Sequence, residues 1–288
     1  MNSSTSPTTS SASSIHPLDE ALQLTPAPTA AGQYEGQTHP GYWNMVGPFG
    51  GITAATLLQA VMQHPDRLGD PLSLTVNYAG ALTAGAFTVQ ATPVRTNRST
   101  QHWTLSILQA GADGAPVVTT TATAVTAVRR ETWSVGDVPM PEVAPPAERK
   151  AVVVPPEAVE WLNRYEMRPL AGFIPRTWDG SGDHSLTQLW MRDTPPRPLD
   201  FVALSALADV FFPRVWLRRA RQVPAGTVSL TVYFHASAAQ LQATGTGYLL
   251  GQARGQEFRN GFFDQTVQLW NEAGTMLATS HQVVYYKE

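Results

Sequence analysis

The sequence predicts an α+β protein made of two tandem units, each a helix wrapped by an antiparallel β-sheet. In each half, one apolar helical stretch is followed by several strand-like runs. The pattern of residues 72–78 is echoed by residues 228–234, at an offset of 156 residues (228 minus 72). A proline-rich stretch separates the two halves, so the order of elements and the repeat both indicate a duplicated unit.

Composition limits the classes of protein to which the chain can belong. Its 288 residues can form one large core or two ordinary ones, and 43% of them are hydrophobic. A net charge of -3 argues against nucleic acid as the main partner. The absence of cysteine excludes thiol catalysis, disulfides and thiolate metal sites, and the seven histidines show no zinc-binding spacing, so no metal site is predicted.

Residues 1–15 are predicted to be a disordered tail, because they are almost wholly Ser, Thr, Asn, Ala and Pro. They lack the apolar segment of a secretion signal, which together with the absence of cysteine favours the cytoplasm. No run of about 18 apolar residues occurs, so no membrane span is predicted.

The first unit, residues 16–130, begins with an aromatic and polar strand and continues with the apolar helix at 52–64. Gly50 and Gly51 precede this helix, whose unpaired amides could bind an anion or a developing oxyanion. A tight turn into a packed helix is the simpler explanation of one Gly-Gly pair. The expected strands of this unit are residues 33–44, 72–78, 86–95, 101–109 and 116–128.

Residues 131–156 carry six prolines and are predicted to be a linker. The second unit, residues 157–288, should hold strands at 161–168 and 186–191, a helix at 201–212, and three or four strands between 227 and 286.

The helix predicted at 201–212 is apolar on every side except at Ser205 and Asp209, which is typical of a buried helix. A buried carboxylate costs several kcal/mol unless it is paired or protonated, and a negative charge near a helix C-terminus opposes the helix dipole. Asp209 is therefore either a functional group or an aspartate that reaches solvent at the helix end.

Several short motifs together resemble the acyl-CoA thioesterase II family. They are Gly-Pro-Phe-Gly-Gly at 47–51, Leu-Ser-Leu-Thr-Val at 72–76, Arg98-Ser99, Tyr-Phe-His at 233–235 and Ser-His-Gln at 280–282. The resemblance extends from about residue 16 to residue 286. It implies a double hotdog fold, in which two tandem hotdog units each have a long central helix wrapped by an antiparallel sheet.

The resemblance also implies a catalytic site of Asp209, Thr227 and Gln282. In the first copy, Gln59 and Ala122 occupy the positions of Asp209 and Gln282, so only one half carries this chemistry. Strand alternation puts Thr227 on the face opposite to Leu230, away from the helix. A bulge at the start of the strand could re-aim Thr227, and Ser229 is the alternative hydroxyl.

The implied reaction is hydrolysis of an acyl-CoA thioester to a fatty acid and CoA, without metal or cofactor. Asp209 would act as general base on a water held by Gln282 and Thr227, and the amides of Gly50 and Gly51 would stabilise the oxyanion. Arg98 is the expected contact for CoA phosphates, and Arg254 and Arg259 are further candidates, although exposed arginines at strand ends are usually only solvated. A homo-oligomer is compatible with this interpretation.

Two other functions share the fold. R-type enoyl-CoA hydratases carry Asp and His five residues apart, a spacing that Asp179 and His184 share without the Asn-Pro of that motif, so a loop coincidence is the preferred interpretation. A non-catalytic hotdog that binds acyl-CoA or lipid would keep the Gly-Gly helix and need neither Asp209 nor Gln282.

Overall fold

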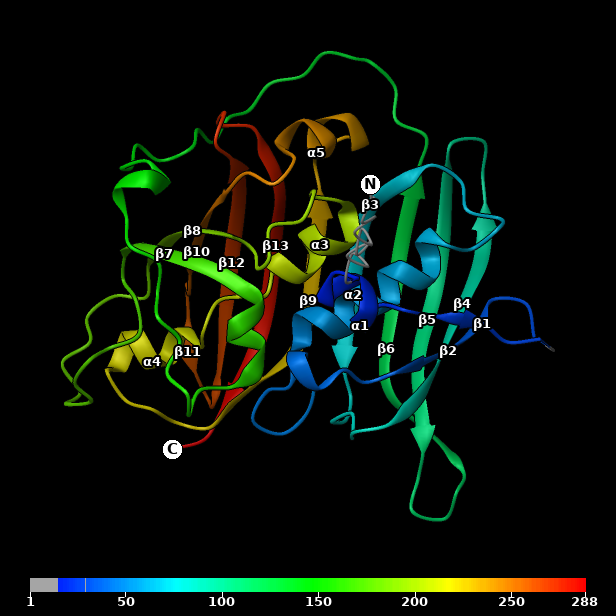
Figure 1. The fold of residues 1–288 in the computed structure, drawn as a ribbon, viewed down its shortest axis with the longest axis horizontal. Helices are drawn as coiled ribbons and strands as arrows, with labels where there is room; N and C mark the ends of the chain where they lie inside the picture. The colour runs from blue at the N-terminus through cyan, green and yellow to red at the C-terminus, as the bar shows by residue number, and fades with distance from the viewer. Residues whose placement is uncertain (1–14, 29) are drawn as a thin grey trace, which may run out of the picture.

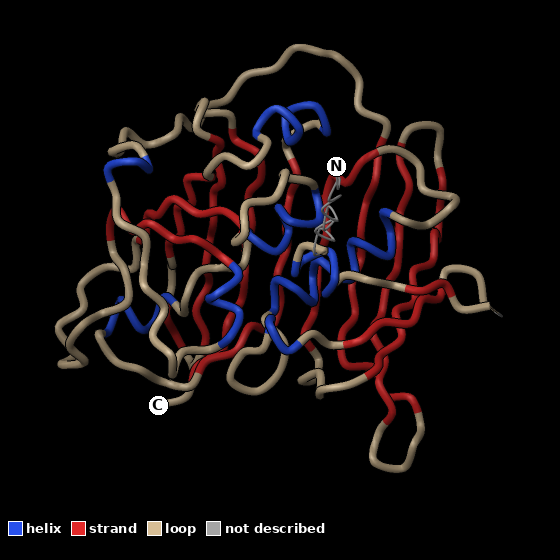
Figure 2. Tube along the Cα trace, viewed as in Figure 1, coloured by secondary structure: helices blue, strands red, loops and turns tan. Residues whose placement is uncertain are grey.

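The computed structural model describes residues 15–28 and 30–288 (Figure 1). Most of the predicted tail, residues 1–14, lies outside the described residues. The described strands join one antiparallel sheet, in the order β1-β2-β4-β5-β6-β3-β9-β13-β12-β10-β8-β7, with β11 paired to β12. Figure 2 shows these strands side by side across the molecule, with helices against the middle of the sheet. No helix in the described ranges has the length and apolarity to cross a membrane.

The first half has five main strands in the order β2-β4-β5-β6-β3, and helix α2 lies against them. Most side chains of α2 are buried, because its sequence is apolar at nearly every position. Its elements are α1 (Pro17–Ala21), β1 (Thr25–Pro26), β2 (Gln33–Gln37), η1 (Pro40–Tyr42), α2 (Gly50–Met62), β3 (Asp70–Tyr78), β4 (Ala86–Thr96), β5 (Thr100–Ala110) and β6 (Pro116–Ala127).

The second half repeats this strand order as β8-β10-β12-β13-β9, and β7 extends the edge. Its elements are η3 (Glu160–Arg164), β7 (Tyr165–Ala171), β8 (Thr187–Asp193), α3 (Phe201–Leu207), α4 (Arg214–Arg219), β9 (Ala225–Phe234), α5 (Ala238–Thr244), β10 (Leu249–Arg254), β11 (Phe258–Arg259), β12 (Phe262–Asn271) and β13 (Met276–Tyr286).

The halves meet along β3 and β9, which pair in antiparallel register. Thr75 lies opposite Thr231, and their hydroxyl oxygens are 3.1 Å apart. These two residues are separated by the 156-residue offset of the sequence repeat. An approximate two-fold axis therefore passes between them, and α2 packs against α3 on one side of the joint sheet.

The helix predicted at 201–212 is shorter than expected, because α3 ends at Leu207. The Asp209 N–H donates to Ala206 O at 3.1 Å, so the last turn tightens and Asp209 lies just beyond the helix. Pro213 has no N–H to donate, and α4 begins after it.

Two further corrections concern the second half. Residues 161–164, predicted as strand, form the 3-10 helix η3, and the helix α5 was not predicted. Helix α5 begins with a capping box in which Ser237 and Gln240 bond each other's backbone N–H groups.

The proline-rich segment 131–156 holds no strand or α-helix, only the 3-10 turn η2 (Pro146–Glu148). It arches over one end of the molecule in Figure 1 and then packs on the outer face of the second half. Met140 and Val143 contact the cluster around Trp190, whose indole N–H donates to Ala144 O at 2.9 Å. The linker is thus a packed strap along part of its length.

Candidate active site

Asp209 lies where the end of α3 meets the start of α2. It is 8% exposed, and a methyl group on Gly50 would lie 2.7 Å from its Oδ2 atom. A methyl group on Gly51 would lie 2.6 Å from Ala206 O. Both glycines are therefore needed for this close approach of the two helix ends, which a tight turn alone would not require.

Asp209, Gln282 and Thr227 form one chain of hydrogen bonds. Gln282 Nε2 donates to Asp209 Oδ1 at 2.6 Å, and Thr227 Oγ1 donates to Gln282 Oε1 at 3.3 Å. Gln282 is 3% exposed, because it lies on the inward face of β13. The structure thus brings together all three residues that the resemblance implied, with Gln282 as the link.

A β-bulge resolves the register of Thr227. Ser229 pairs with Val283 and Thr227 pairs with Val284, so Val228 is the extra residue in β9. Val284 is buried, and residues directly opposite in an antiparallel pair point to the same face of the sheet. Thr227 therefore points inward with Leu230 and Gln282, and simple alternation put it on the wrong face.

Burial controls the charge of Asp209. Loss of solvent raises the pKa of this carboxyl from 3.8 to about 7, while hydrogen bonds from Gln282 and from the Gly51 amide act in the opposite direction. A carboxylate whose pKa lies near neutrality can both accept and return a proton at physiological pH.

Tyr78, at the end of β3, is a polar neighbour that the sequence analysis missed. Its hydroxyl donates to Gly50 O at 2.8 Å. Burial and the charge of Asp209 raise the pKa of Tyr78 well above its usual range, so the phenol stays protonated. The sequence repeat could have identified Tyr78. Residue 234, at the equivalent position 156 residues later, is phenylalanine, so the two copies differ here by a hydroxyl group.

Ser280 is a second residue that was missed. Its buried hydroxyl donates to Ala208 O at 3.1 Å, next to Asp209 in the chain. This bond ties the turn that carries Asp209 to β13, two residues before Gln282.

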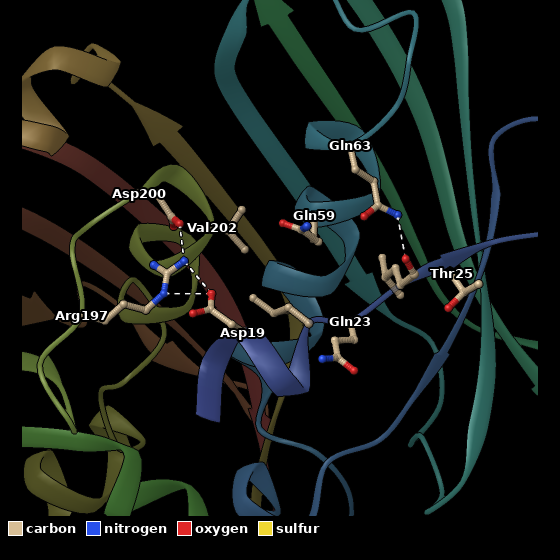
Figure 3. Close-up of a pocket in the computed structure, with 10 residues that line it drawn as sticks. Asp19, Gln23, Thr25, Gln59, Gln63, Arg197, Asp200 and Val202 are labelled. Atoms are coloured by element: carbon tan, nitrogen blue, oxygen red, sulfur yellow. Dashed lines mark hydrogen bonds and ion pairs between the residues drawn. The ribbon is translucent and has the colours of Figure 1, made fainter. Parts of the chain in front are cut away.

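The first half presents a different surface at the pseudo-symmetric position. A cavity of about 410 Å³ lies there, between Gln59 on α2 and Asp200 at the start of α3 (Figure 3). Arg197 bridges Asp19 and Asp200, with nitrogen to oxygen distances of 2.8 and 2.6 Å. Gln59 and Asp200 replace Asp209 and Gly50 here, so this cavity has no equivalent of the Asp209 carboxylate, and its helix does not begin with glycine.

The structure does not bring Arg98 to the site. Arg98 is exposed in the turn between β4 and β5, at the end of the sheet where Ala127 pairs with Asp70. Tyr78 and Gly50 lie at the other end of β3. Arg254 ends β10, and Arg259 is an exposed residue paired with Glu257 at 3.0 Å.

Asp179 and His184 both lie on the irregular loop before β8, and both are exposed. Asp179 Oδ1 accepts from the Ser181 amide at 2.9 Å, which is an ordinary loop bond. Within the described ranges, no three His, Asp or Glu side chains gather as a metal site would need.

Two family descriptions match the chain in tandem. Residues 39–127 match the acyl-CoA thioesterase N-terminal domain, and residues 138–286 match the acyl-CoA thioesterase C-terminal domain. The chain belongs to the acyl-CoA thioesterase family. No curated protein matches this thioesterase-family chain.

Solved structures similar to this acyl-CoA thioesterase family member share the hotdog fold. A hotdog protein of unknown function from Alicyclobacillus acidocaldarius is 47% identical, with a TM-score of 0.88 and coverage of 95% of this chain and 99% of that chain. Acyl-CoA thioesterase II TesB2 from Mycobacterium marinum is 17% identical, with a TM-score of 0.73 and coverage of 94% and 98%. The tesB protein from Mycobacterium avium subs paratuberculosis is 16% identical, with a TM-score of 0.72 and the same coverage.

Proposed function

We propose that this chain is a double hotdog enzyme that hydrolyses acyl-CoA thioesters with a water activated by Asp209. The observation that carries the proposal is the buried Asp209 carboxylate, bonded to Gln282 and set against a helix that begins with two glycines. A structural aspartate would not need a helix start without side chains beside its Oδ2 atom. The family assignment supports the substrate class.

The hydrogen bonds give each residue a distinct role. Gln282 occupies Oδ1 of Asp209, and Thr227 fixes the amide of Gln282, so these two residues orient the carboxylate. Oδ2 faces the space beside Gly50, where a water can lose its proton to it. This arrangement differs from the expectation that Gln282 and Thr227 themselves hold the water.

The reaction then proceeds in two steps. The water oxygen attacks the thioester carbonyl carbon as its proton passes to Asp209, and the carbonyl oxygen becomes an oxyanion. Collapse of this intermediate breaks the C–S bond, and Asp209 returns the proton to the CoA thiolate. The Gly51 amide already bonds the Asp209 carboxylate, so the Gly50 amide is the remaining donor of the pair for the oxyanion.

The rate enhancement expected from these groups is sufficient for hydrolysis of a thioester, which is an activated substrate. General-base assistance contributes about 10² to 10⁴ in rate, and one oxyanion donor contributes about 10² to 10³. The reaction consumes only water, and Asp209 supplies the base, so the proposed mechanism passes no step through a metal or cofactor.

The test is a panel of acyl-CoAs from short to long, with release of free thiol as the readout. We expect hydrolysis of at least one chain length by the wild type and loss of at least about 10²-fold in kcat by Asp209→Asn. Binding of acyl-CoA without thiol release from any member would refute the proposal in favour of a binding protein. Hydration of an enoyl-CoA in a parallel assay would refute it in favour of a hydratase.

A further inference from the structure

We infer that Tyr78 is a further catalytic residue of this site, and that its hydroxyl oxygen holds the nucleophilic water together with Asp209 Oδ2. This inference rests on the proposed thioesterase function. It assigns a role in catalysis to a side chain of the first half of the chain, whereas Asp209, Thr227 and Gln282 all come from the second half.

The two oxygens face the same small volume. A methyl group on Gly50 would lie 2.7 Å from Asp209 Oδ2 and 3.3 Å from the Tyr78 hydroxyl oxygen. Because residue 50 is glycine, that volume contains no side-chain atom of its own. Both acceptors are therefore within hydrogen-bonding range of a water placed just outside it, next to the start of α2.

The hydroxyl oxygen of Tyr78 can only accept a hydrogen bond from this water. Its single proton is donated to Gly50 O at 2.8 Å, so its lone pairs are the part that remains available. Asp209 accepts one proton of the water and Tyr78 accepts the other. With both protons engaged, a lone pair of the water oxygen points away from the two residues, toward the position of the thioester carbon.

The step balances without a further reagent. The proton that faces Oδ2 passes to Asp209 as the water oxygen bonds to the carbonyl carbon. Tyr78 keeps its own proton on Gly50 O throughout and continues to accept the second water proton. Burial and the Asp209 charge raise the pKa of Tyr78 well above its usual range, which keeps the phenol neutral during this transfer.

The duplicated architecture supplies an independent argument. At the pseudo-symmetric position, every polar group of the site is replaced by a residue that cannot do its work. Gln59 stands for Asp209, Pro71 for Thr227 and Phe234 for Tyr78. The equivalent of Gln282 is Ala124, which pairs with Leu74 as Gln282 pairs with Leu230, and not Ala122 as the sequence repeat indicated. Phe234 fills the equivalent space by edge-to-face packing on Phe201, with ring centroids 5.8 Å apart. The phenol is thus found at the site that holds Asp209, although it comes from the other half of the chain, and a phenyl ring takes its place at the pseudo-symmetric site.

The experiment is steady-state thiol release by Tyr78→Phe, beside the wild type and Asp209→Asn. We expect kcat to fall about 10- to 100-fold with KM nearly unchanged, because a bond to the water is lost while contacts to CoA remain. Tyr233→Phe is the matched control, since Tyr233 is 50% exposed on β9 and should leave kcat unchanged.

A double-mutant cycle separates a catalytic role from a structural one. If both residues act on one water, adding Tyr78→Phe to the Asp209→Asn variant should lower kcat only slightly further. Wild-type kcat in Tyr78→Phe, or a loss explained by a lower fraction of folded protein, would overturn the inference and leave the proposed function intact. A wild type that releases no thiol would instead overturn the proposed function and this inference with it.

A second variant tests the same volume without changing Tyr78. Gly50→Ala puts a methyl group between the two oxygens and should displace the water, so we expect a loss of at least about 10²-fold in kcat. A Gly50→Ala protein that folds and keeps the wild-type kcat would contradict the inference, as would a Tyr78→Phe protein with wild-type kcat.

Discussion

Asp209→Asn should separate the effect of the buried charge on stability from its effect on catalysis. The variant keeps the shape of the side chain and removes the group that titrates. Burial raises the pKa of Asp209 from 3.8 to about 7 in the folded protein. Between these two values the folded state holds a proton that the unfolded state has lost. Stability therefore falls as pH rises from about 4 to about 7, and the total cost at pH 8 is about 4 kcal/mol.

The variant should lose this pH dependence. At pH 8 we expect Asp209→Asn to be about 1 to 4 kcal/mol more stable than the wild type, and the gain should shrink toward zero near pH 4, where Asp209 is protonated. Its kcat should fall by about 10² or more. For the wild type, the same titration predicts a kcat that rises with pH through about 7, as the base becomes ionised.

Chemical denaturation at a series of pH values, together with kcat per folded molecule, measures both effects. Asp264→Asn is the matched control: burial raises the pKa of Asp264, but amide bonds from Glu257 and Gln256 and the bond from His281 bring it below its usual value. That variant should lose stability at pH 8 and keep its kcat. If Asp209→Asn were less stable at pH 8 and still turned over normally, Asp209 would be a structural residue and the mechanism would be wrong.

Three other predictions test the surroundings of Asp209. Gly51→Ala should lower both melting temperature and kcat, because its methyl would lie 2.6 Å from Ala206 O, whereas Gly80→Ala, with no atom within 4 Å, should change neither. Thr227→Val should lower kcat about 10-fold through loss of its bond to Gln282, and Thr227→Ser should restore most of it; equal rates for the two would exclude this role. Arg98→Ala should leave KM for acyl-CoA unchanged, since Arg98 lies at the far end of the sheet from Gly50, and a rise in KM would return Arg98 to the CoA site.

Helix α2 and most of the strands were predictable because local signals agree with the tertiary structure. The helix expected at 52–64 is found at Gly50–Met62, and its apolar residues pack in the core. The strand expected at 72–78 is Asp70–Tyr78, and the repeat that relates it to residues 228–234 became the antiparallel pair at the pseudo-axis. Periodicity and turn residues suffice where each element buries a continuous face.

The end of α3 was not predictable from its own residues. The apolar pattern continues to Phe212, but the helix ends where the Asp209 N–H turns back to Ala206 O. The Ala208 carbonyl there is bonded by Ser280, a residue 72 positions later in the chain. A contact so distant in sequence leaves no trace in helical periodicity, and it is this contact that helps to aim Asp209.

Thr227 and Tyr78 show two other limits. Alternation along β9 fails at Val228, because one extra residue reverses the facing of everything before it. Tyr78 alone resembles any aromatic residue at a strand end, and only comparison with Phe234 in the other copy distinguishes it. The apolar helix pattern singled out Asp209, the resemblance to a family added Thr227 and Gln282, and the repeat held the evidence for Tyr78.

The pairing of β3 with β9 has a consequence for how the chain is made. During synthesis, β3 can pair with β6 once residue 127 has emerged, but its other edge waits for residues that come more than 150 positions after it. Until then the ribosome-bound first half exposes an open strand edge, a known route to aggregation. Catalytic competence should accordingly appear late and in one step, when β9 closes that edge and the turn after α3 reaches the glycines of α2.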